Sequence, residues 1–310
     1  MWRFLITRLA QSLLSIVGAS VVIFIISRLS GDPIAILLPN DAPASLIART
    51  KHDLGLDLPL WRQYVIFAGN ALHGDFGNSY RWQMPALTLV LERLPATIQL
   101  AVAALTFSVA LAIPFGVLSA VYRGSWFDTF GKGFAMLGQA MPGFWVGLLL
   151  ILVFAIYLGW LPAFGHGSPA HLVMPAIALG WYPVAAQTRV IRSAMLDVLD
   201  SDYIRVARAL GAPERVLIWK YAFRNAAIPL VTILGVYFAS MLGGAFVVEV
   251  IFAWPGVGRT VVEAVFARDF PVVFGGTIVI LLVVMFVNLA VDISYAFLDP
   301  RIRYGNAGKG

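Results

Sequence analysis

Long apolar runs separated by basic loops constrain this chain more than any other feature of its sequence. A helix needs roughly 20 apolar residues to cross the hydrocarbon core of a bilayer. Composition agrees with a membrane location, because only 12% of the residues are charged, against roughly 25% in soluble domains. We therefore predict an all-α polytopic integral membrane protein with six transmembrane helices. The predicted spans lie near residues 9–26, 97–121, 138–158, 172–191, 228–248 and 276–298.

Two of these runs allow other interpretations. The basic start before the first run, with Arg3 and Arg8, also fits a secretory signal peptide. The run is longer than the usual signal centre of roughly 7–15 residues, and no convincing cleavage site follows it. The fourth run is interrupted by Pro175, Pro183 and Gln187. Prolines in spans free backbone groups that neighbouring helices or cavity water can satisfy, so they indicate either a transport path or packing alone.

Residues 30–94 differ in composition from the apolar runs on either side. Their apolar stretches are too short to span a bilayer, and charged residues, prolines and glycines are frequent. Gly-Asp and Asp-Pro pairs here favour turns. We predict that residues 1–29 form the first transmembrane helix and that 30–94 form a small domain outside the membrane.

Basic residues set the predicted orientation. Six spans place both termini on one side, and Lys and Arg number 14 on that side and 8 on the other. Six of those eight belong to the long segment after the first span, and long loops weigh little in the positive-inside rule. Both termini are therefore predicted to be cytoplasmic, and 30–94 extracytoplasmic.

A basic, amphipathic stretch at 202–229 lies between the fourth and fifth runs. Asp202 can cap a first helix, and Gly211 can end it. The apolar residues of this helix recur at helical spacing: Tyr203, Val206, Ala207 and Leu210. Small residues gather at its end and permit close approach of another backbone: Ala207, Ala209, Gly211 and Ala212. The stretch is either an elbow that docks into a partner or a basic loop that only obeys the topology rule.

A second helix is predicted to begin at Pro213, a residue favoured in the first turn. Glu214 falls in its first turn, whereas Lys220 and Arg224 come late in it. Both placements suit the helix dipole, which favours acidic groups at the start and basic groups at the end.

No catalytic constellation is evident in the sequence. The chain has no cysteine and no GxxxxGK[ST] stretch, so it has no thiol chemistry and no P-loop with which to hydrolyse ATP. His166 and His171 share one short loop without an acidic residue, and exposed turn residues describe them better than metal ligands do. The modest net charge of +6 reflects membrane orientation and not nucleic-acid binding.

Two carboxylates lie within or near the predicted spans, at Glu249 and Asp292. Ionisable groups there are costly and usually face a cavity or a partner. Glu249 is a candidate gate or path residue, and Asp292 either pairs with a basic residue such as Arg192 or marks an interface. The aromatic belt at the membrane surface accounts for three tryptophans near span ends without invoking a substrate: Trp160, Trp181 and Trp254.

The elbow resembles the EAA loop of ABC importer permeases, specifically their dipeptide, oligopeptide and nickel branch. That branch reads roughly Y-[IV]-R-x-A-R-A-x-G followed by R-N-A-x-x-P, which 203–211 and 224–229 match. Arg205 stands where the wider family has glutamate, and Val206 replaces the first alanine. Both departures are normal for the peptide branch.

Further phrases in the same order extend the resemblance over essentially the whole chain. The phrase at 249–259 matches E-x-[IV]-F-x-W-P-G-x-G-R. Its Pro255 and Gly256 and the following Gly258 are not expected to continue a helix, so they predict a connector or re-entrant turn on the outer face. The others are Gly31-Asp32-Pro33, Leu54-Gly55-Leu56-Asp57, Gly74-Asp75-Phe76-Gly77, Arg268-Asp269-Phe270-Pro271 and Asp299-Pro300-Arg301-Ile302-Arg303.

The resemblance implies the permease subunit of an ATP-driven importer in the bacterial inner membrane, without a catalytic, metal or cofactor site of its own. It implies a five-helix core at 95–300 with a cytoplasmic coupling loop at 193–227, and a cytoplasmic tail at 301–310. The implied partners are a homologous second permease, two ATPase subunits that bind ATP and Mg, an extracytoplasmic solute-binding protein and the lipid bilayer. The implied coupling residues are Tyr203, Arg205, Ala207, Arg208, Gly211, Pro213, Arg224, Asn225 and Pro229. Candidate path or gate residues are Glu249, Trp254, Pro255, Gly256 and Asp292.

Several cargoes and mechanisms remain open at this point. The resemblance favours di- or oligopeptides, with nickel or another metal chelate, glutathione and opines as alternatives. An ion-coupled secondary transporter would need no ATPase and would usually carry more ionisable groups at the membrane midplane. An intramembrane enzyme would need a constellation such as Ser/Lys or Asp/Asp inside the spans, and we find none.

The charge asymmetry makes a direct prediction about topology. Accessibility tags placed after Gly310 and within the 211–215 turn should both be cytoplasmic, whereas a tag at Pro43 should be outside. Labelling of intact cells and of inverted vesicles distinguishes the two faces. Finding the tags at Pro43 and Gly310 on the same face would contradict the predicted orientation.

Overall fold

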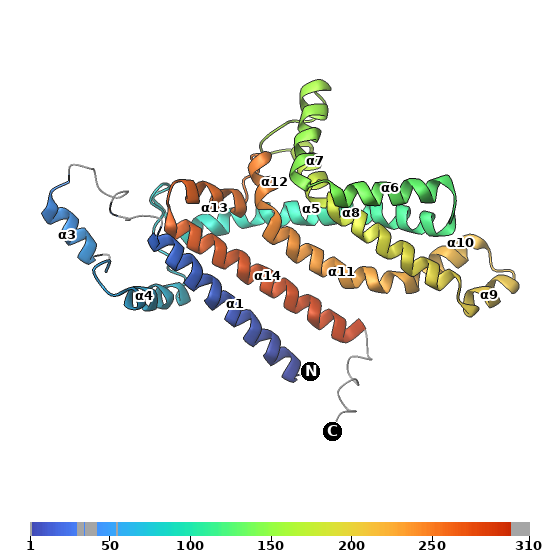
Figure 1. Cartoon of the computed structure of the whole chain (residues 1–310), viewed down its shortest axis with the longest axis horizontal. Coiled ribbons are helices and arrows are strands. Elements are labelled where there is room, and N and C mark those ends of the chain that lie inside the picture. Colours follow the sequence, from blue (N-terminus) through green and yellow to red (C-terminus); the bar gives the residue numbers. More distant parts are fainter. Residues whose placement is uncertain (1, 30–33, 35–41, 54, 299–310) are drawn as a thin grey trace. The chain divides into compact units, whose positions relative to one another are not determined.

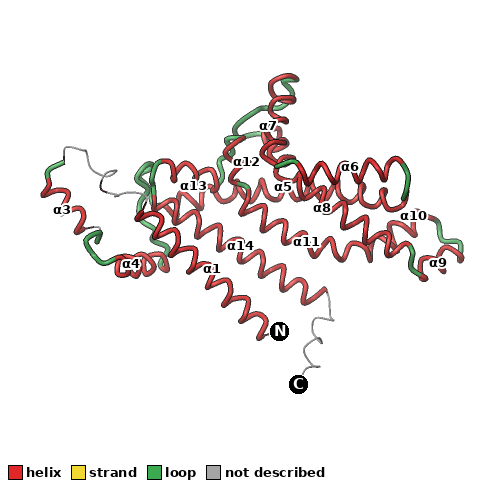
Figure 2. Tube along the Cα trace, viewed as in Figure 1, coloured by secondary structure: helices red, strands yellow, loops and turns green. Residues whose placement is uncertain are grey.

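The fold is built from helices in the computed structural model, which describes residues 2–29, 34, 42–53 and 55–298 (Figure 1). Within these residues there is no strand, only an isolated bridge between Asn78 and Pro85 (Figure 2). The all-α class is therefore confirmed. The chain divides into two compact units: 1–96 with 255–286, and 97–254 with 287–310.

The first unit places the 77–85 loop against the turn between two later helices. Asp269 in that turn is fully buried, and it accepts hydrogen bonds from Ser79 Oγ at 2.5 Å and from the Arg81 amide at 3.2 Å. Leu89 packs nearby against Ala264 and Val272. The unit comprises α1 (Trp2–Leu29), α3 (Ala44–Asp53), α4 (Leu60–Leu72), the start of α5 (Ala86–Val121), α13 (Val257–Phe266) and most of α14 (Phe270–Leu298).

In its described residues, the segment predicted as an extramembrane domain contains the two short helices α3 and α4 and several turns. Gly77 adopts a positive φ of 87°, and its amide donates to Asp75 Oδ1 at 2.9 Å, so this glycine phrase forms a turn as predicted. Helix α5 begins at Ala86, so the last residues of 30–94 are helical. The phrase Gly31-Asp32-Pro33 lies outside the described residues.

The second unit is organised around α8, which packs against α6, α7 and α11. Small residues bring these backbones close together. A Cβ at Gly138 would lie 2.5 Å from that of Ala185, and a Cβ at Gly180 would lie 2.7 Å from the carbonyl oxygen of Ala104. The unit contains the rest of α5, α6 (Trp126–Ala140), α7 (Gly143–Leu150), the π-helix η1 (Ile151–Tyr157), α8 (Pro169–Leu199), α9 (Asp202–Ala209), α10 (Glu214–Val216), the π-helix η2 (Leu217–Ala222), α11 (Phe223–Gly244) and α12 (Phe246–Ile251).

Four helices in the described part of the chain are long and apolar enough to cross a membrane: Ala10–Leu29, Ala86–Val121, Glu214–Gly244 and Phe270–Val291. A fifth candidate is the pair formed by α6 with α7 and η1, which is bent by 103°. Helix α8 has 31 residues but is not among these candidates. It covers the interrupted fourth run and carries charged residues toward its end.

Two predicted runs differ from the helices that form. The third run, at 138–158, is not one continuous helix, because Met141 is extended with φ −93° and ψ 120°. Pro142 follows it, and a proline disfavours the helical conformation of the preceding residue. The fifth run, at 228–248, belongs to a helix that already begins at Glu214, and this helix ends at Gly244.

A buried carboxylate connects three helices of the second unit. Asp128 on α6 has a side chain that is 1% exposed, and its two oxygens accept from Arg192 Nε at 2.8 Å and Arg192 Nη2 at 3.0 Å. Ser119 on α5 donates its hydroxyl at 2.7 Å, and Lys132 Nζ lies 2.9 Å away. Arg192, which was considered as one possible partner for Asp292, pairs with Asp128.

Removing the charge of Asp128 should destabilise the second unit. Asp128→Asn keeps the shape but leaves Arg192 without its counter-charge, and breaking a buried pair costs roughly 3 kcal/mol. We expect a lower unfolding temperature for the detergent-solubilised chain. The control is Asp197→Asn, which removes an exposed carboxylate from α8. Equal unfolding temperatures for the two variants would show that the pair contributes nothing to stability.

Candidate functional site

The elbow forms a short helix, a glycine turn and a second helix, as the sequence predicts. Ser201, and not Asp202, is the N-cap of α9, and Asp202 lies in the first turn. After the helix, Gly211 has φ +83°, a conformation that glycine adopts without steric cost. The Ala212 amide donates to the Ala207 carbonyl at 3.2 Å and closes the turn.

Ile204 anchors α9 to the second unit. Its side chain is fully buried in an apolar cluster with Met195 of α8 and with Ala222 and Ala226 of the following helix. Periodicity directed attention to the other face of α9, so the sequence analysis missed this residue. Ile204 itself was the available signal, because it is the one large aliphatic side chain of this helix outside the predicted face.

Polar contacts fix the elbow on both sides of the turn. Asn225 donates from Nδ2 to the Tyr203 hydroxyl at 2.8 Å and to the Tyr221 carbonyl at 3.1 Å. Arg208 donates from Nε to Glu214 Oε1 at 2.7 Å across the turn. This hydrogen bond raises the pKa of Arg208 above its usual value. Three of the predicted coupling residues, Tyr203, Arg208 and Asn225, therefore hold the elbow in shape.

The predicted apolar face of α9 is exposed. Tyr203 is 44% exposed, Val206 58% and Leu210 82%, and these residues recur at helical spacing. Ala207 is half-buried and Arg205 is exposed beside them. Because Ile204 holds the opposite face, α9 presents this apolar stripe outward on a fixed support.

The second helix of the elbow is longer than predicted. From Glu214 the chain continues as one helix to Gly244, and Pro229 lies inside it. Glu214 is in the first turn as predicted. The dipole argument for Lys220 and Arg224 is wrong, because both residues lie far from the end of this helix.

A second group of candidate residues surrounds α12. Glu249 is fully buried, and its Oε1 accepts from the Thr97 hydroxyl at 2.7 Å. Trp254 is 1% exposed, with its ring 4.7 Å from that of His166 in an edge arrangement. The belt explanation for Trp254 is therefore wrong, whereas Trp160 is 70% exposed and remains compatible with it.

The chain turns sharply after α12. Ala253 has φ +51°, and Gly256 is the extended N-cap of α13, so a connector forms as predicted. Gly258 was not expected to continue a helix, yet it lies in the first turn of α13. Pro255 and Gly256 begin the segment that belongs to the first unit. Asp292 falls on α14, and its side chain lies outside the described residues.

Helix α8 carries buried polar atoms that the sequence analysis did not assign to a site. Among the described residues, Trp181 Nε1, both amide atoms of Gln187 and Thr188 Oγ1 are buried without a hydrogen-bond partner. Such groups are costly and are rare in folded proteins. Gln187 was noted only as an interruption of the apolar run, because a sequence does not reveal whether an amide is satisfied.

No group of three or more histidines, cysteines or acids that could hold a metal occurs in the described part of the chain. His171 Nδ1 lies 2.8 Å from Ser168 Oγ, and His166 Nε2 lies 3.3 Å from Gln99 Oε1. The two histidines of this loop thus contact different neighbours.

Comparison with known proteins identifies the class. The family described as "Binding-protein-dependent transport system inner membrane component" matches residues 112–304, and its N-terminal companion family matches residues 1–101. The chain is an integral membrane protein of this family, a permease subunit of the peptide branch of ABC importers.

Two relatives match over nearly their whole length. The dipeptide transport system permease protein DppB of Alkalihalophilus pseudofirmus is 37% identical, over 93% of this chain and 96% of its own. The glutathione transport system permease protein GsiC of Escherichia coli (strain K12) is also 37% identical, over 98% of this chain and 100% of its own.

The fold also occurs in a solved structure. A chain of the MetNI methionine ABC transporter, in inward-facing conformations, matches 68% of this chain and 96% of its own with a TM-score of 0.55. At 16% identity, this likeness shows that the two chains share a fold.

The role of Ile204 as anchor predicts local loosening when it is truncated. Ile204→Ala removes a fully buried side chain, at a typical cost of about 2–5 kcal/mol. We expect faster amide hydrogen exchange in 202–210 than in the unmodified chain. Leu210→Ala truncates an exposed side chain at the C-cap of the same helix and should leave exchange there unchanged. If both variants exchange alike, α9 is not held by Ile204.

Proposed function

We propose that this chain forms the translocation path of an ATP-driven importer for di- or oligopeptides. The names of its relatives support this cargo class, because dipeptides and glutathione are both short peptides. Glutathione is the alternative cargo, because one relative is a glutathione permease, but a dipeptide permease matches this chain over an equal share of its length. Nickel or another metal chelate and opines receive no comparable support.

The proposed topology has six transmembrane helices with both termini in the cytoplasm. Helix α8 supplies the sixth span beside the five candidates, since 31 residues extend over about 46 Å, more than the roughly 30 Å of the hydrocarbon core. Residues 1–29 are then the first span, 30–94 an extracytoplasmic domain, 95–300 the core with its coupling loop at 193–227, and 301–310 a cytoplasmic tail.

The elbow is the proposed contact with the ATPase subunits, which bind ATP and Mg. A homologous second permease completes the path, and a solute-binding protein delivers cargo from outside. When the two ATPase subunits close around bound ATP, they push α9. Ile204 transfers this movement to α8 and to the helix after the turn. The Tyr203–Asn225 hydrogen bond keeps both helices moving together, so that the cavity changes the side on which it opens.

Glu249 and Trp254 remain the proposed gate, together with Pro255, Gly256 and Asp292. Buried carboxylates at membrane depth usually face a path or partner, and Glu249 is fully buried. The unpartnered polar atoms of Gln187 and Thr188 on α8 add a second set of path candidates. They would find hydrogen-bond partners in a conformation or assembly that admits water or cargo.

One observation carries this proposal: α9 presents an exposed apolar stripe on a firmly anchored support in a chain of this family. Gly211→Val should abolish transport, because a β-branched residue at positive φ strains the turn by about 1–2 kcal/mol and adds bulk at the contact. Ala207→Glu should also abolish transport, because it places an unpaired charge in the interface and weakens binding of the ATPase by about 2–5 kcal/mol. Transport in proteoliposomes and ATPase co-purification measure both effects.

The matched control is Gly159→Val in the loop between η1 and α8. Gly159 also has a positive φ, at 64°, and open space around it, so the variant carries the same kind of strain outside the elbow. It should retain ATPase binding and most transport. Full transport by both elbow variants would mean that the elbow is only a basic loop.

A further inference from the structure

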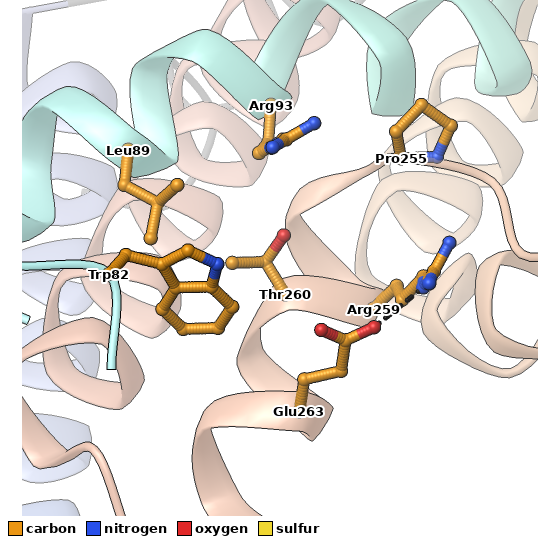
Figure 3. Close-up of a pocket in the computed structure, with 7 residues that line it drawn as sticks. All are labelled: Trp82, Leu89, Arg93, Pro255, Arg259, Thr260 and Glu263. Carbon is orange, nitrogen blue, oxygen red and sulfur yellow. Dashed lines mark hydrogen bonds and ion pairs between the residues drawn. The ribbon is translucent and has the colours of Figure 1, made fainter. Parts of the chain in front are cut away.

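A small charged pocket in the first unit shares only Pro255 with the gate proposed above. It lies between the start of α5 and α13 and has a volume of 120 Å³ (Figure 3). Arg93 on α5 lies across the pocket from Thr260 and Arg259 on α13, and Trp82 closes another side. The residues that line it are Trp82, Leu89, Arg93, Pro255, Arg259, Thr260 and Glu263.

Arg93 is the charged residue of this pocket that lacks a partner in the described part of the chain. Glu263 is the sole acidic residue lining it, and it already accepts from Arg259 Nε at 2.8 Å and lies 3.8 Å from Arg81 Nη1. Arg93 is half-buried, and its guanidinium makes no hydrogen bond or ion pair among the described residues. Arg93 thus presents a positive charge that no other described residue neutralises, and this charge favours an anionic ligand.

The pocket is preformed by contacts that lie outside it. The loop that carries Trp82 is held by Asp269, through the Ser79 hydroxyl and the Arg81 amide, and the Trp82 amide donates to Ser79 Oγ at 2.9 Å. Ala86 and Leu89 pack against α13 and α14 below it. Binding an anion there therefore requires little reorganisation, which favours affinity.

The size of the pocket restricts the ligand to an end group. Sites for whole small molecules usually measure about 300–1,000 Å³, whereas 120 Å³ corresponds to roughly four water molecules. A complete peptide cargo is too large. A carboxylate is small enough, and its two oxygens match the planar donors of Arg93.

The length of α5 places this pocket at a membrane surface. The helix has 36 residues and measures about 54 Å, well beyond the roughly 30 Å hydrocarbon core. One end of α5 therefore projects from the membrane, and we place its charged residues Glu92 and Arg93, which lie near the start of the helix, in this projecting end. In the topology proposed above, this is the outer end, where the binding protein that names the family must dock.

We propose that this pocket receives an aspartate or glutamate side chain of the cargo-loaded binding protein, with Arg93 as its principal partner. The inference rests on the proposed function, because it assumes the outward orientation of this surface. A lipid phosphate fits the pocket less well. Acyl chains need a continuous apolar groove, and only Trp82, Leu89 and Pro255 among the lining residues are apolar.

The test uses the complete transporter in nanodiscs together with its own binding protein. Arg93→Glu should raise the dissociation constant of the binding protein on the order of tenfold or more and reduce its stimulation of ATP hydrolysis, whereas basal hydrolysis stays unchanged. Arg93→Lys keeps the positive charge, so it should lose less affinity for the binding protein than Arg93→Glu does. Salt should weaken binding of the wild type more than that of Arg93→Glu.

Arg62→Glu on α4 is the matched control, because it makes the same charge change at an exposed arginine outside the pocket. An acidic residue of the binding protein changed to arginine should restore binding to Arg93→Glu, which also shows that the variant is folded. Equal affinity of the Arg93→Glu and Arg62→Glu transporters for the binding protein would overturn the proposal. A loss of binding by Arg93→Glu that occurs only in nanodiscs of anionic lipid would also overturn it. A wild-type transporter that no binding protein stimulates would instead refute the proposed function itself.

Discussion

A charged side chain is tolerated among membrane helices only when other groups of the protein pair with it or donate hydrogen bonds to it. The second unit depends on such contacts to Asp128. The bidentate contact with Arg192 and the hydroxyl of Ser119 tie α5, α6 and α8 together. Arg192 lies about two turns before the end of α8. The Arg192–Asp128 contact therefore fixes α8 close to the point where this helix ends and the elbow begins.

The elbow then acts as a short rigid lever. Ile204 fixes one face of α9 to α8 and to the helix that follows the turn, while Arg208 and Glu214 hold the turn itself. With one face fixed, a force on the exposed stripe of Tyr203, Val206 and Leu210 reaches two membrane helices at once. A flexible loop of the same composition would absorb the movement.

Much of this architecture could be predicted from the sequence, because apolar length and turn residues are local signals. The positive φ of Gly211 and the first-turn position of Glu214 follow directly from the residues present. Contacts between distant residues could not be predicted in this way. Asp128 was not identified, because no residue near it in the sequence indicates that its partner is Arg192, which lies 64 positions later. Arg192 was considered as a partner for Asp292 instead.

The same limit applies to the site. Periodicity identified an apolar face on α9 but not which face is buried, and the anchor Ile204 was therefore missed. Trp254 looked like a belt residue because it follows an apolar run, whereas the fold buries it beside His166. Whether the buried amide of Gln187 has a partner is also a property of the packed structure alone.

The most direct test of the lever account is the accessibility of Leu210 with and without the ATPase subunits. The chain contains no cysteine, so Leu210→Cys introduces a single reactive thiol at a position that is 82% exposed. The account predicts rapid maleimide labelling of the chain alone and strong protection in the assembled transporter. Tyr122→Cys, at an exposed residue directly after α5, is the control and should be labelled in both. Equal labelling of Leu210→Cys in an assembly that hydrolyses ATP would contradict it.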